Sequence, residues 1–137
     1  RKTYRYTINN SEQGSAIYRN LEYHMPQKLN FEEMKKAIKY FEGEHDFKAF
    51  KSSGGSGKTT IRTIYKAEIE RENERIIELT GNGFLYNMVR IITGTLVEVG
   101  MEKIKAEQIP EIMESRDRKL AGRTLPAHGL CLIKVEY

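Results

Sequence analysis

The run from Gly81 to Gly100 (GNGFLYNMVRIITGTLVEVG) is the most strongly periodic segment of the 137-residue chain. Its apolar residues recur at intervals of three and four, which would align them in one stripe along a helix. Glycines stand near both ends, where helices often begin and end. The run therefore predicts a long, buried helix against which the other elements pack. The residues of the stripe are Leu85, Met88, Val89, Ile92, Leu96 and Val99.

Arg90 does not suit a plain core helix. It lies about 140° around the helix from Leu85, at roughly 100° per residue, on a face that it shares with Asn87 and Gly94. Because Gly94 has no side chain, another backbone could approach that face closely. A covered face would make Arg90 a buried charge in need of an anionic partner. An uncovered face would leave it solvated, as is usual for a mid-helix arginine.

Five further segments have the patterns of strands or helices. Pro110 is expected to limit the regular part of the last helix. The segments are a strand at Thr3–Ile8, a helix from the N-cap Asn30 (with Glu33 as its partner) to Gly43, a hairpin of Thr59–Ile69 and Arg75–Thr80, a helix at Lys105–Ser115 and a strand at Leu130–Tyr137.

The order of these elements predicts an α+β fold, in which a mostly antiparallel β-sheet is backed by helices. The length fits a single domain over residues 1–137, and no internal repeat or boundary divides it. The chain begins at Arg1, without methionine and directly in a strand pattern. We therefore expect it to be a fragment of a longer protein.

Alternation assigns faces to two of the strands. Cys131 falls on an apolar face of the last strand, so we expect a small core residue rather than a reactive thiolate. In the first hairpin strand, one face is expected to carry Ile61, Thr63, Tyr65, Ala67 and Ile69.

Composition narrows the class of protein. With 39% hydrophobic and 31% charged residues the chain is ordinary for a globular protein, and its net charge of +4 leans toward a polyanion such as nucleic acid. A single cysteine allows no internal disulfide. No apolar run reaches the roughly 18 residues of a membrane span and no signal peptide is present, so we expect a cytoplasmic protein.

The three histidines are scattered, and no pair of potential ligands has metal-binding spacing, so no metal is predicted. His45 and Asp46 are adjacent, but no nucleophile accompanies them. Turn formation and capping are the roles that we expect for this pair.

The loop KSSGGSGK is the one low-complexity stretch. It resembles the end of a phosphate-binding P-loop, but that motif needs a glycine where Ser52 stands and a helix where a strand pattern follows. Two interpretations remain open: a mobile basic loop that contacts a nucleic-acid backbone, and a plain solvated linker. The candidate RNA-binding residues are Lys51, Gly54, Gly55, Ser56, Gly57 and Lys58.

Several runs together resemble the C-terminal part of the tRNA pseudouridine synthase A family. The similarity extends through the whole chain in the family's order, and MVRIITGTLVEVG is its most specific run. The runs are KTYRY (Lys2–Tyr6), GEHDFKAF (Gly43–Phe50), IRTI (Ile61–Ile64), GNGFLYNMVRIITGTLVEVG (Gly81–Gly100) and RTLPAHGLCLIKVEY (Arg123–Tyr137).

The resemblance implies an isomerase that converts uridine to pseudouridine at positions 38, 39 and 40 of the tRNA anticodon stem–loop. Such an enzyme detaches uracil, rotates it and reattaches it through carbon, without a cofactor. The family acts as a homodimer, with tRNA crossing both subunits. From a different class, a non-catalytic RNA-binding module remains the alternative.

The family's nucleophile is an aspartate in an R-T-D-x-G-V-H-A motif. The only aspartates here, Asp46 and Asp117, lie in other contexts, and the similar GRTLPAHG run has Leu125 at that position. The resemblance therefore implies that the chain alone is inactive.

Two active-site roles follow from the resemblance. Arg90 matches the arginine that pairs with the catalytic aspartate, and Tyr4 matches the tyrosine that stacks on the target base. Without the family, Tyr4 would be interpreted first as a core aromatic. Phe84, Leu85 and Met88 are expected to wall the pocket. We therefore expect Arg90 to lie in an open cleft beside Tyr4.

Overall fold

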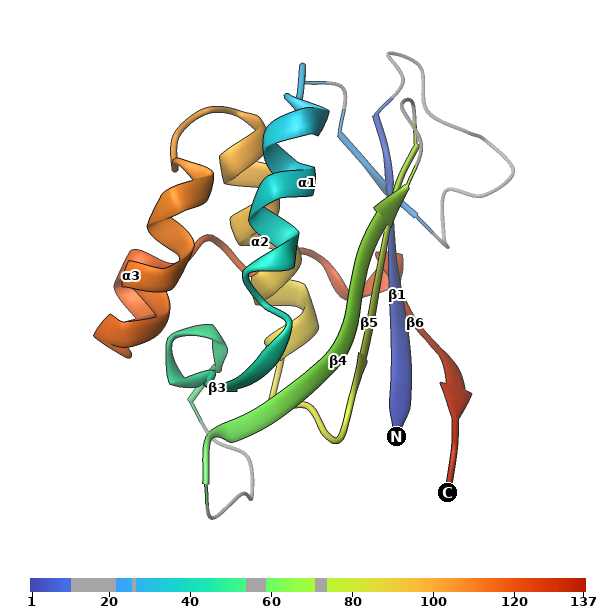
Figure 1. Ribbon diagram of the computed structural model, residues 1–137. Helices are drawn as coiled ribbons and strands as arrows, with labels where there is room; N and C mark the ends of the chain where they lie inside the picture. The colour runs from blue at the N-terminus through green and yellow to red at the C-terminus, as the bar shows by residue number, and fades with distance from the viewer. Residues whose placement is uncertain (11–21, 26, 54–58, 71–73) are drawn as a thin grey trace.

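The structure is a computed structural model that describes residues 1–10, 22–25, 27–53, 59–70 and 74–137 (Figure 1). Its strands are β1 (Lys2–Asn9), β2 (Tyr23–His24), β3 (Gly43–Asp46), β4 (Ile61–Glu70), β5 (Glu74–Gly81) and β6 (Leu130–Val135). Its α-helices are α1 (Phe31–Lys39), α2 (Met88–Gly100) and α3 (Ile109–Ser115). Short 3-10 turns are η1 (Lys48–Phe50), η2 (Ala106–Gln108), η3 (Arg118–Leu120) and η4 (Ala127–Gly129).

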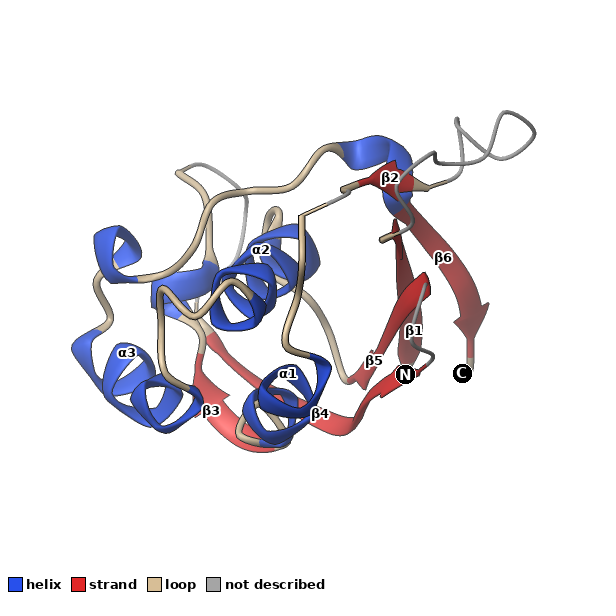
Figure 2. Cartoon of the chain, turned by 90° about the horizontal axis from the view of Figure 1, so that it is seen from above, coloured by secondary structure: helices blue, strands red, loops and turns tan. Residues whose placement is uncertain are grey.

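The strands form one sheet in the order β2-β1-β5-β4-β3, and β6 also pairs with β1. All of these pairs are antiparallel except β1 with β2. The three α-helices lie on one side of the sheet, and β6 lies at the edge away from them (Figures 1 and 2). The predicted α+β fold with a mostly antiparallel sheet is confirmed.

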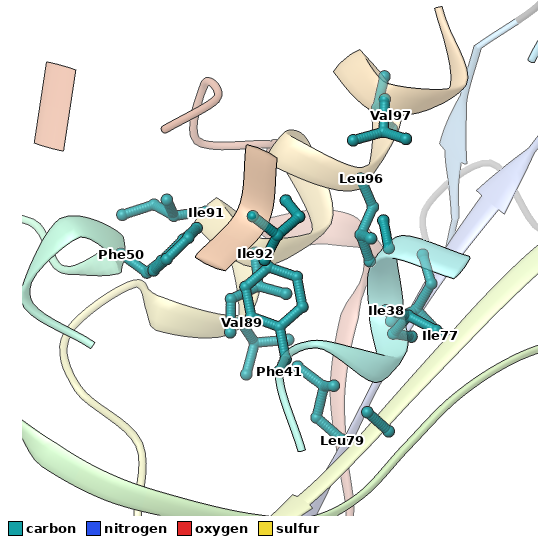
Figure 3. Close-up of a cluster of buried hydrophobic side chains, with 14 of the residues drawn as sticks. Ile38, Phe41, Phe50, Ile77, Leu79, Val89, Ile91, Ile92, Leu96 and Val97 are labelled. Carbon is teal, nitrogen blue, oxygen red and sulfur yellow. The ribbon is translucent and has the colours of Figure 1, made fainter. Parts of the chain in front are cut away.

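The core lies between the sheet and the helices. Side chains of α1, α2 and β5 meet there, and Phe50 from η1 closes one end (Figure 3). Phe41 and Phe50 meet edge to face with ring centroids 5.1 Å apart, a favourable aromatic geometry. The segment 44–50, which sequence analysis assigned to no element, thus supplies both a strand and core aromatics.

Helix α1 begins as predicted, because the Asn30 side chain accepts a hydrogen bond of 3.2 Å from the Glu33 N–H. It ends at Lys39, before the predicted end at Gly43. Gly43 instead starts β3 with a φ of 103°, a backbone conformation that glycine adopts at little cost.

Helix α2 is buried on nearly all sides, and all six residues of the predicted apolar stripe are buried. It begins at Met88 rather than near Gly81, because its N-cap Asn87 has a left-handed backbone with a φ of 60°. The residues between β5 and Asn87 form the turn that leads into the helix.

The predicted face of β4 is wrong in its first half. Tyr65 is exposed and Ile64 is buried, whereas Ala67 and Ile69 are both buried and so share one face. The pairing register with β5 shifts between Ile64 and Lys66. This irregularity reverses which residues face the core, since strand side chains alternate.

The prediction that Cys131 is a core residue is wrong, because it is exposed. Strand β6 pairs only with β1 within the described chain, and its residues from Cys131 to Val135 are exposed. No described helix covers this edge of the sheet (Figure 2). None of the described helices is long and apolar enough to cross a membrane.

Candidate active site

Arg90 lies in the first turn of α2 and is partly buried. That turn contains no acidic side chain. The N-terminus of a helix carries a partial positive charge, which adds to the charge of the guanidinium. The first turn of α2 is therefore a place where an anion would be favoured.

Two hydrogen bonds fix the guanidinium. Arg90 Nε donates to the Leu125 carbonyl oxygen at 2.7 Å, and Nη1 donates to Asn87 Oδ1 at 2.8 Å. The Leu125 N–H donates in return to the Arg90 carbonyl oxygen at 3.3 Å. Within the described chain, Nη2 has no hydrogen-bond partner and no carboxylate contacts the guanidinium. Arg90 is thus oriented by neutral acceptors, with donor capacity left over.

The segment 122–125 covers the face of α2 that carries Arg90. A Cβ atom at Gly94 would overlap the Arg123 carbonyl oxygen, so this close approach requires glycine. The Gly122 N–H donates to Thr95 Oγ1 at 2.8 Å and fastens the segment to the helix. Of the two possibilities for this face, the structure shows the covered one, with a partly buried arginine at its end.

Asn87 connects Arg90 to the base of the Lys51–Lys58 loop. Its Oδ1 accepts from Arg90, while its Nδ2 donates to Ser52 Oγ at 3.1 Å. The Ser52 N–H donates to the Tyr86 carbonyl oxygen at 3.1 Å. Both the oxygen and the nitrogen of the Asn87 amide are therefore hydrogen-bonded, and the base of the loop is held against the start of α2.

Tyr6 of β1 lies against the segment that follows Leu125. It is fully buried, and its hydroxyl donates to the Pro126 carbonyl oxygen at 2.6 Å. Burial and the neighbouring Tyr23 raise the pKa of Tyr6 far above its usual value, and the positive charge of Arg90 acts in the opposite direction. Tyr6 and Arg90 thus hydrogen-bond to consecutive carbonyl groups, those of Pro126 and Leu125.

Tyr4 lies two residues earlier, on the same face of β1. Its ring is partly buried and meets Phe84 edge to face, with centroids 5.0 Å apart and planes at 85°. Its hydroxyl has no hydrogen-bond partner among the described residues. Leu85 and Met88 are buried, and the Leu85 N–H contacts Met88 Sδ at 3.5 Å.

The structure brings Tyr4, Phe84, Leu85 and Met88 together beside the start of α2. That Tyr4 and Arg90 face one open cleft stays a prediction. Lys51 is partly buried, and its Nζ donates to the Ser52 carbonyl oxygen at 3.1 Å.

The rest of the predicted RNA-binding loop lies outside the described residues: Gly54, Gly55, Ser56, Gly57 and Lys58. The element after this loop is strand β4, which argues against a P-loop, as the sequence indicated. Asp46 forms a turn, as expected, because its Oδ1 accepts from the Lys48 N–H at 3.1 Å.

Sequence reasoning missed most of the groups that hold Arg90. Asn87 precedes Arg90 by three residues, a spacing at which side chains on a helix meet, so this contact could have been predicted from the sequence. The contacts of Ser52 with Asn87 and of the Leu125 carbonyl with Arg90 could not have been predicted in this way. In each pair the residues are 35 positions apart, and the Leu125 group is a backbone atom.

Comparisons with known proteins identify the family of the chain. A family model described as tRNA pseudouridine synthase matches residues 37–137. The chain is 57% identical to "tRNA pseudouridine synthase A" of Acetivibrio thermocellus over 137 residues, which are 99% of this chain and 56% of that protein. The protein of the same name from Clostridium acetobutylicum is also 57% identical, with the same coverage.

That of Thermoanaerobacter pseudethanolicus is 51% identical over 138 residues, which are 100% of this chain and 57% of that protein. The chain belongs to the tRNA pseudouridine synthase family. It spans just over half the length of these relatives.

Proposed function

We propose that this chain is the C-terminal domain of a tRNA pseudouridine synthase A, which isomerises uridine to pseudouridine in the anticodon stem–loop of tRNA. The relatives bear this name, and the similarity covers nearly the whole chain. Because the chain spans 56% of the first two relatives, the remainder of such an enzyme would supply the other half of the site.

The orientation of Arg90 carries the proposal. Its guanidinium is held by Leu125 and Asn87, and its Nη2 has no partner in the described chain. A fixed cation keeps a nearby carboxylate ionised and positions it. We assign that carboxylate to the family's catalytic aspartate, which this chain does not contain.

Tyr4 would stack on the target uracil. Its ring is already supported edge-on by Phe84, and its hydroxyl has no partner in the described chain. Phe84, Leu85 and Met88 would form the apolar wall that excludes water. The reaction breaks the bond from ribose to nitrogen and makes one from ribose to C5 of the same base. As an isomerisation it needs no oxidant, reductant or cofactor.

We also propose which uridines are modified, where the enzyme acts and how it assembles. The substrate uridines are at positions 38, 39 and 40, and the enzyme is a cytoplasmic homodimer whose Lys51–Lys58 loop contacts tRNA. The net charge of +4 fits an RNA partner.

A turnover assay tests the proposed function. The full-length protein and this chain alone are incubated with tRNA tritiated at C5 of uridine, because bonding at C5 releases that tritium. We expect release by the full-length protein and none by the chain alone. If the full-length protein binds tRNA but releases no tritium, the non-catalytic RNA-binding alternative gains and the proposed function fails. Turnover by the chain alone would refute the assignment of an aspartate outside it.

A further inference from the structure

A second polar surface lies where η1 and η3 meet, close to the start of α2. It is an open depression of about 410 Å³ lined by Lys48, Lys51, Ser52, Ser53, Arg116 and Arg118, with Asp117 in its wall. We call it the basic depression. Its two sides come from chain segments more than 60 residues apart, because η1 packs against both α3 and η3. In Figure 1 the neighbouring strand β3 and the end of α3 lie on the same side of the molecule.

The charge of the basic depression is positive after its internal ion pairs are counted. Four cations line it, and two carboxylates lie beside it. Asp117 caps η3 by accepting from the Lys119 N–H at 2.9 Å. Asp46 accepts from Arg116 Nε at 3.0 Å. Even if both carboxylates offset a full charge each, cationic charge remains.

Hydrogen-bond donors also remain. The Arg116 side chain is 62% exposed, and only its Nε is used, so both of its Nη groups have no partner within the described residues. Nζ of Lys48 also has no hydrogen-bond partner among the described residues. Among the same residues, Nζ of Lys51 donates only to the Ser52 carbonyl oxygen. The Ser52 hydroxyl accepts from Asn87 and can still donate its own proton.

This lining suits a phosphodiester backbone better than a small molecule. Small-molecule pockets are mostly apolar with a few polar groups, whereas charged and hydroxyl side chains line this depression. Lysine, arginine and serine donors on an open surface are the groups that contact phosphate oxygens in nucleic-acid complexes.

Two chains of contacts link the basic depression to Arg90. On one side, Ser52 is bonded to Asn87, which holds the Arg90 guanidinium. On the other, Arg118 donates to the Gly122 carbonyl oxygen at 2.8 Å and to Thr124 Oγ1 at 3.1 Å. Thr124 precedes Leu125, whose carbonyl oxygen receives Arg90 Nε.

We propose that the basic depression binds backbone phosphates of the RNA substrate next to the target nucleotide, with Lys48 and Arg116 as its main contacts. The inference rests on the proposed function for the identity of the RNA. It adds Lys48 of η1, Arg116 at the C-cap of α3 and Arg118 of η3 to an interface that sequence analysis placed only in the Lys51–Lys58 loop.

The test compares two double variants of the full-length protein. One, Lys48→Ala with Arg116→Gln, removes two charges from the basic depression. The control, Lys36→Ala with Lys66→Ala, removes two exposed charges from α1 and β4, whose side chains are 57% and 64% exposed. The dissociation constant for tRNA is measured at several salt concentrations, and turnover is measured at saturating tRNA.

We expect the first variant to bind tRNA about tenfold more weakly at moderate salt, with a log–log salt slope smaller by about one per lost contact. Its kcat should stay within about twofold, because the chemistry is elsewhere. Lys48→Ala with Arg116→Lys keeps one of the two charges and should therefore restore about half of the lost slope.

Equal affinity and salt slope in the two double variants would overturn the proposal. So would a salt slope that Arg116→Lys fails to restore even in part, because the defect would then not be one of charge. Since binding is measured without turnover, a failure of the proposed isomerase activity would be seen separately in the tritium assay.

Discussion

The inner face of β1 has two neighbouring regions that differ sharply. Around Tyr6 the structure is closed: the hydroxyl is bonded to Pro126, and a Cβ atom at Gly129 would come within 2.7 Å of the ring. Around Tyr4 it is more open: the ring packs against the core and meets Phe84 in a T-shaped arrangement, but it is partly exposed and its hydroxyl has no partner in the described chain.

The difference separates a structural role from a functional one on the same strand. A buried hydroxyl must be hydrogen-bonded, and Tyr6 satisfies that requirement inside the chain. The Tyr4 hydroxyl and the Nη2 group of Arg90 could each still form hydrogen bonds, because no described residue bonds to them. If the proposed function is right, changes in the open region should affect turnover and changes in the closed region should affect stability.

Arg90→Ala in the full-length protein should have the largest effect. Removing one partner of a desolvated ion pair typically costs about 3–5 kcal/mol. If the pair acts in the transition state, turnover should fall about 10³-fold while tRNA binding is largely kept. Tritium release under saturating tRNA measures it.

Arg123→Ala is the matched control, because Arg123 is exposed on the segment that covers the same face of α2. It should leave turnover within about twofold. Near-normal turnover of Arg90→Ala would remove the role that we assign to Arg90.

Tyr4→Leu should be the next most damaging change. Stacking of a base on an aromatic ring is worth about 1–3 kcal/mol, so turnover should fall roughly 10- to 100-fold. Little stability should be lost, because the ring is partly exposed. Turnover assays and thermal melts on the same preparation check both parts. A large drop in melting temperature with normal turnover would mean that Tyr4 is a core residue like Tyr6.

Removing the Asn87 amide should have an intermediate effect. The guanidinium would lose one of its two orienting hydrogen bonds, which for a charged group is worth about 1.5–3 kcal/mol. We expect kcat to fall about tenfold with a smaller change in KM.

The left-handed backbone of Asn87 allows a matched pair of variants. Asn87→Ala and Asn87→Gly both delete the amide, but only alanine is strained at this φ. Both should lose kcat alike, and only Asn87→Ala should also lose stability. If kcat follows stability instead, Asn87 does not position Arg90.

Tyr6→Phe should have the smallest effect, and it should lower the stability of the fold without changing turnover. It removes a buried hydrogen bond and leaves the Pro126 carbonyl oxygen without that donor, at a cost of about 1 kcal/mol. Turnover at a temperature well below unfolding should change less than about twofold. A loss comparable to that of Tyr4→Leu would erase the contrast between the two regions.

The pH dependence of stability provides a further check on Tyr6. Burial and Tyr23 raise the pKa of Tyr6, so the unfolded chain loses this proton at lower pH than the folded chain. The free energy of unfolding should therefore decline as pH rises above about 10, the usual tyrosine value. Denaturant titrations should show a shallower decline in Tyr6→Phe. Identical declines would show that the group does not titrate differently on folding.

Periodicity predicted the fold where burial is one-sided or complete. The apolar stripe of α2 and the Asn30 cap of α1 are local patterns, and both were found. Prediction failed where a tertiary feature overrides alternation. The register shift at Tyr65 reverses a face of β4, and the position of β6 at a sheet edge exposes Cys131.

The site was only half visible in the sequence for a related reason. Arg90 was conspicuous because a charge interrupts an apolar helix. Its orienting partner Leu125 acts through a backbone oxygen 35 residues away, and Arg116 reaches the basic depression through tertiary packing. Backbone acceptors and surface charges have no periodic signature, so only the folded chain reveals them.

A crystal structure of the full-length protein bound to tRNA would show directly whether Arg90 Nη2 pairs with a catalytic carboxylate. We expect an aspartate oxygen about 2.7–2.9 Å from Nη2 and the Tyr4 ring stacked on the target uracil. An Arg90 guanidinium without a carboxylate partner, or a target base remote from Tyr4, would contradict it.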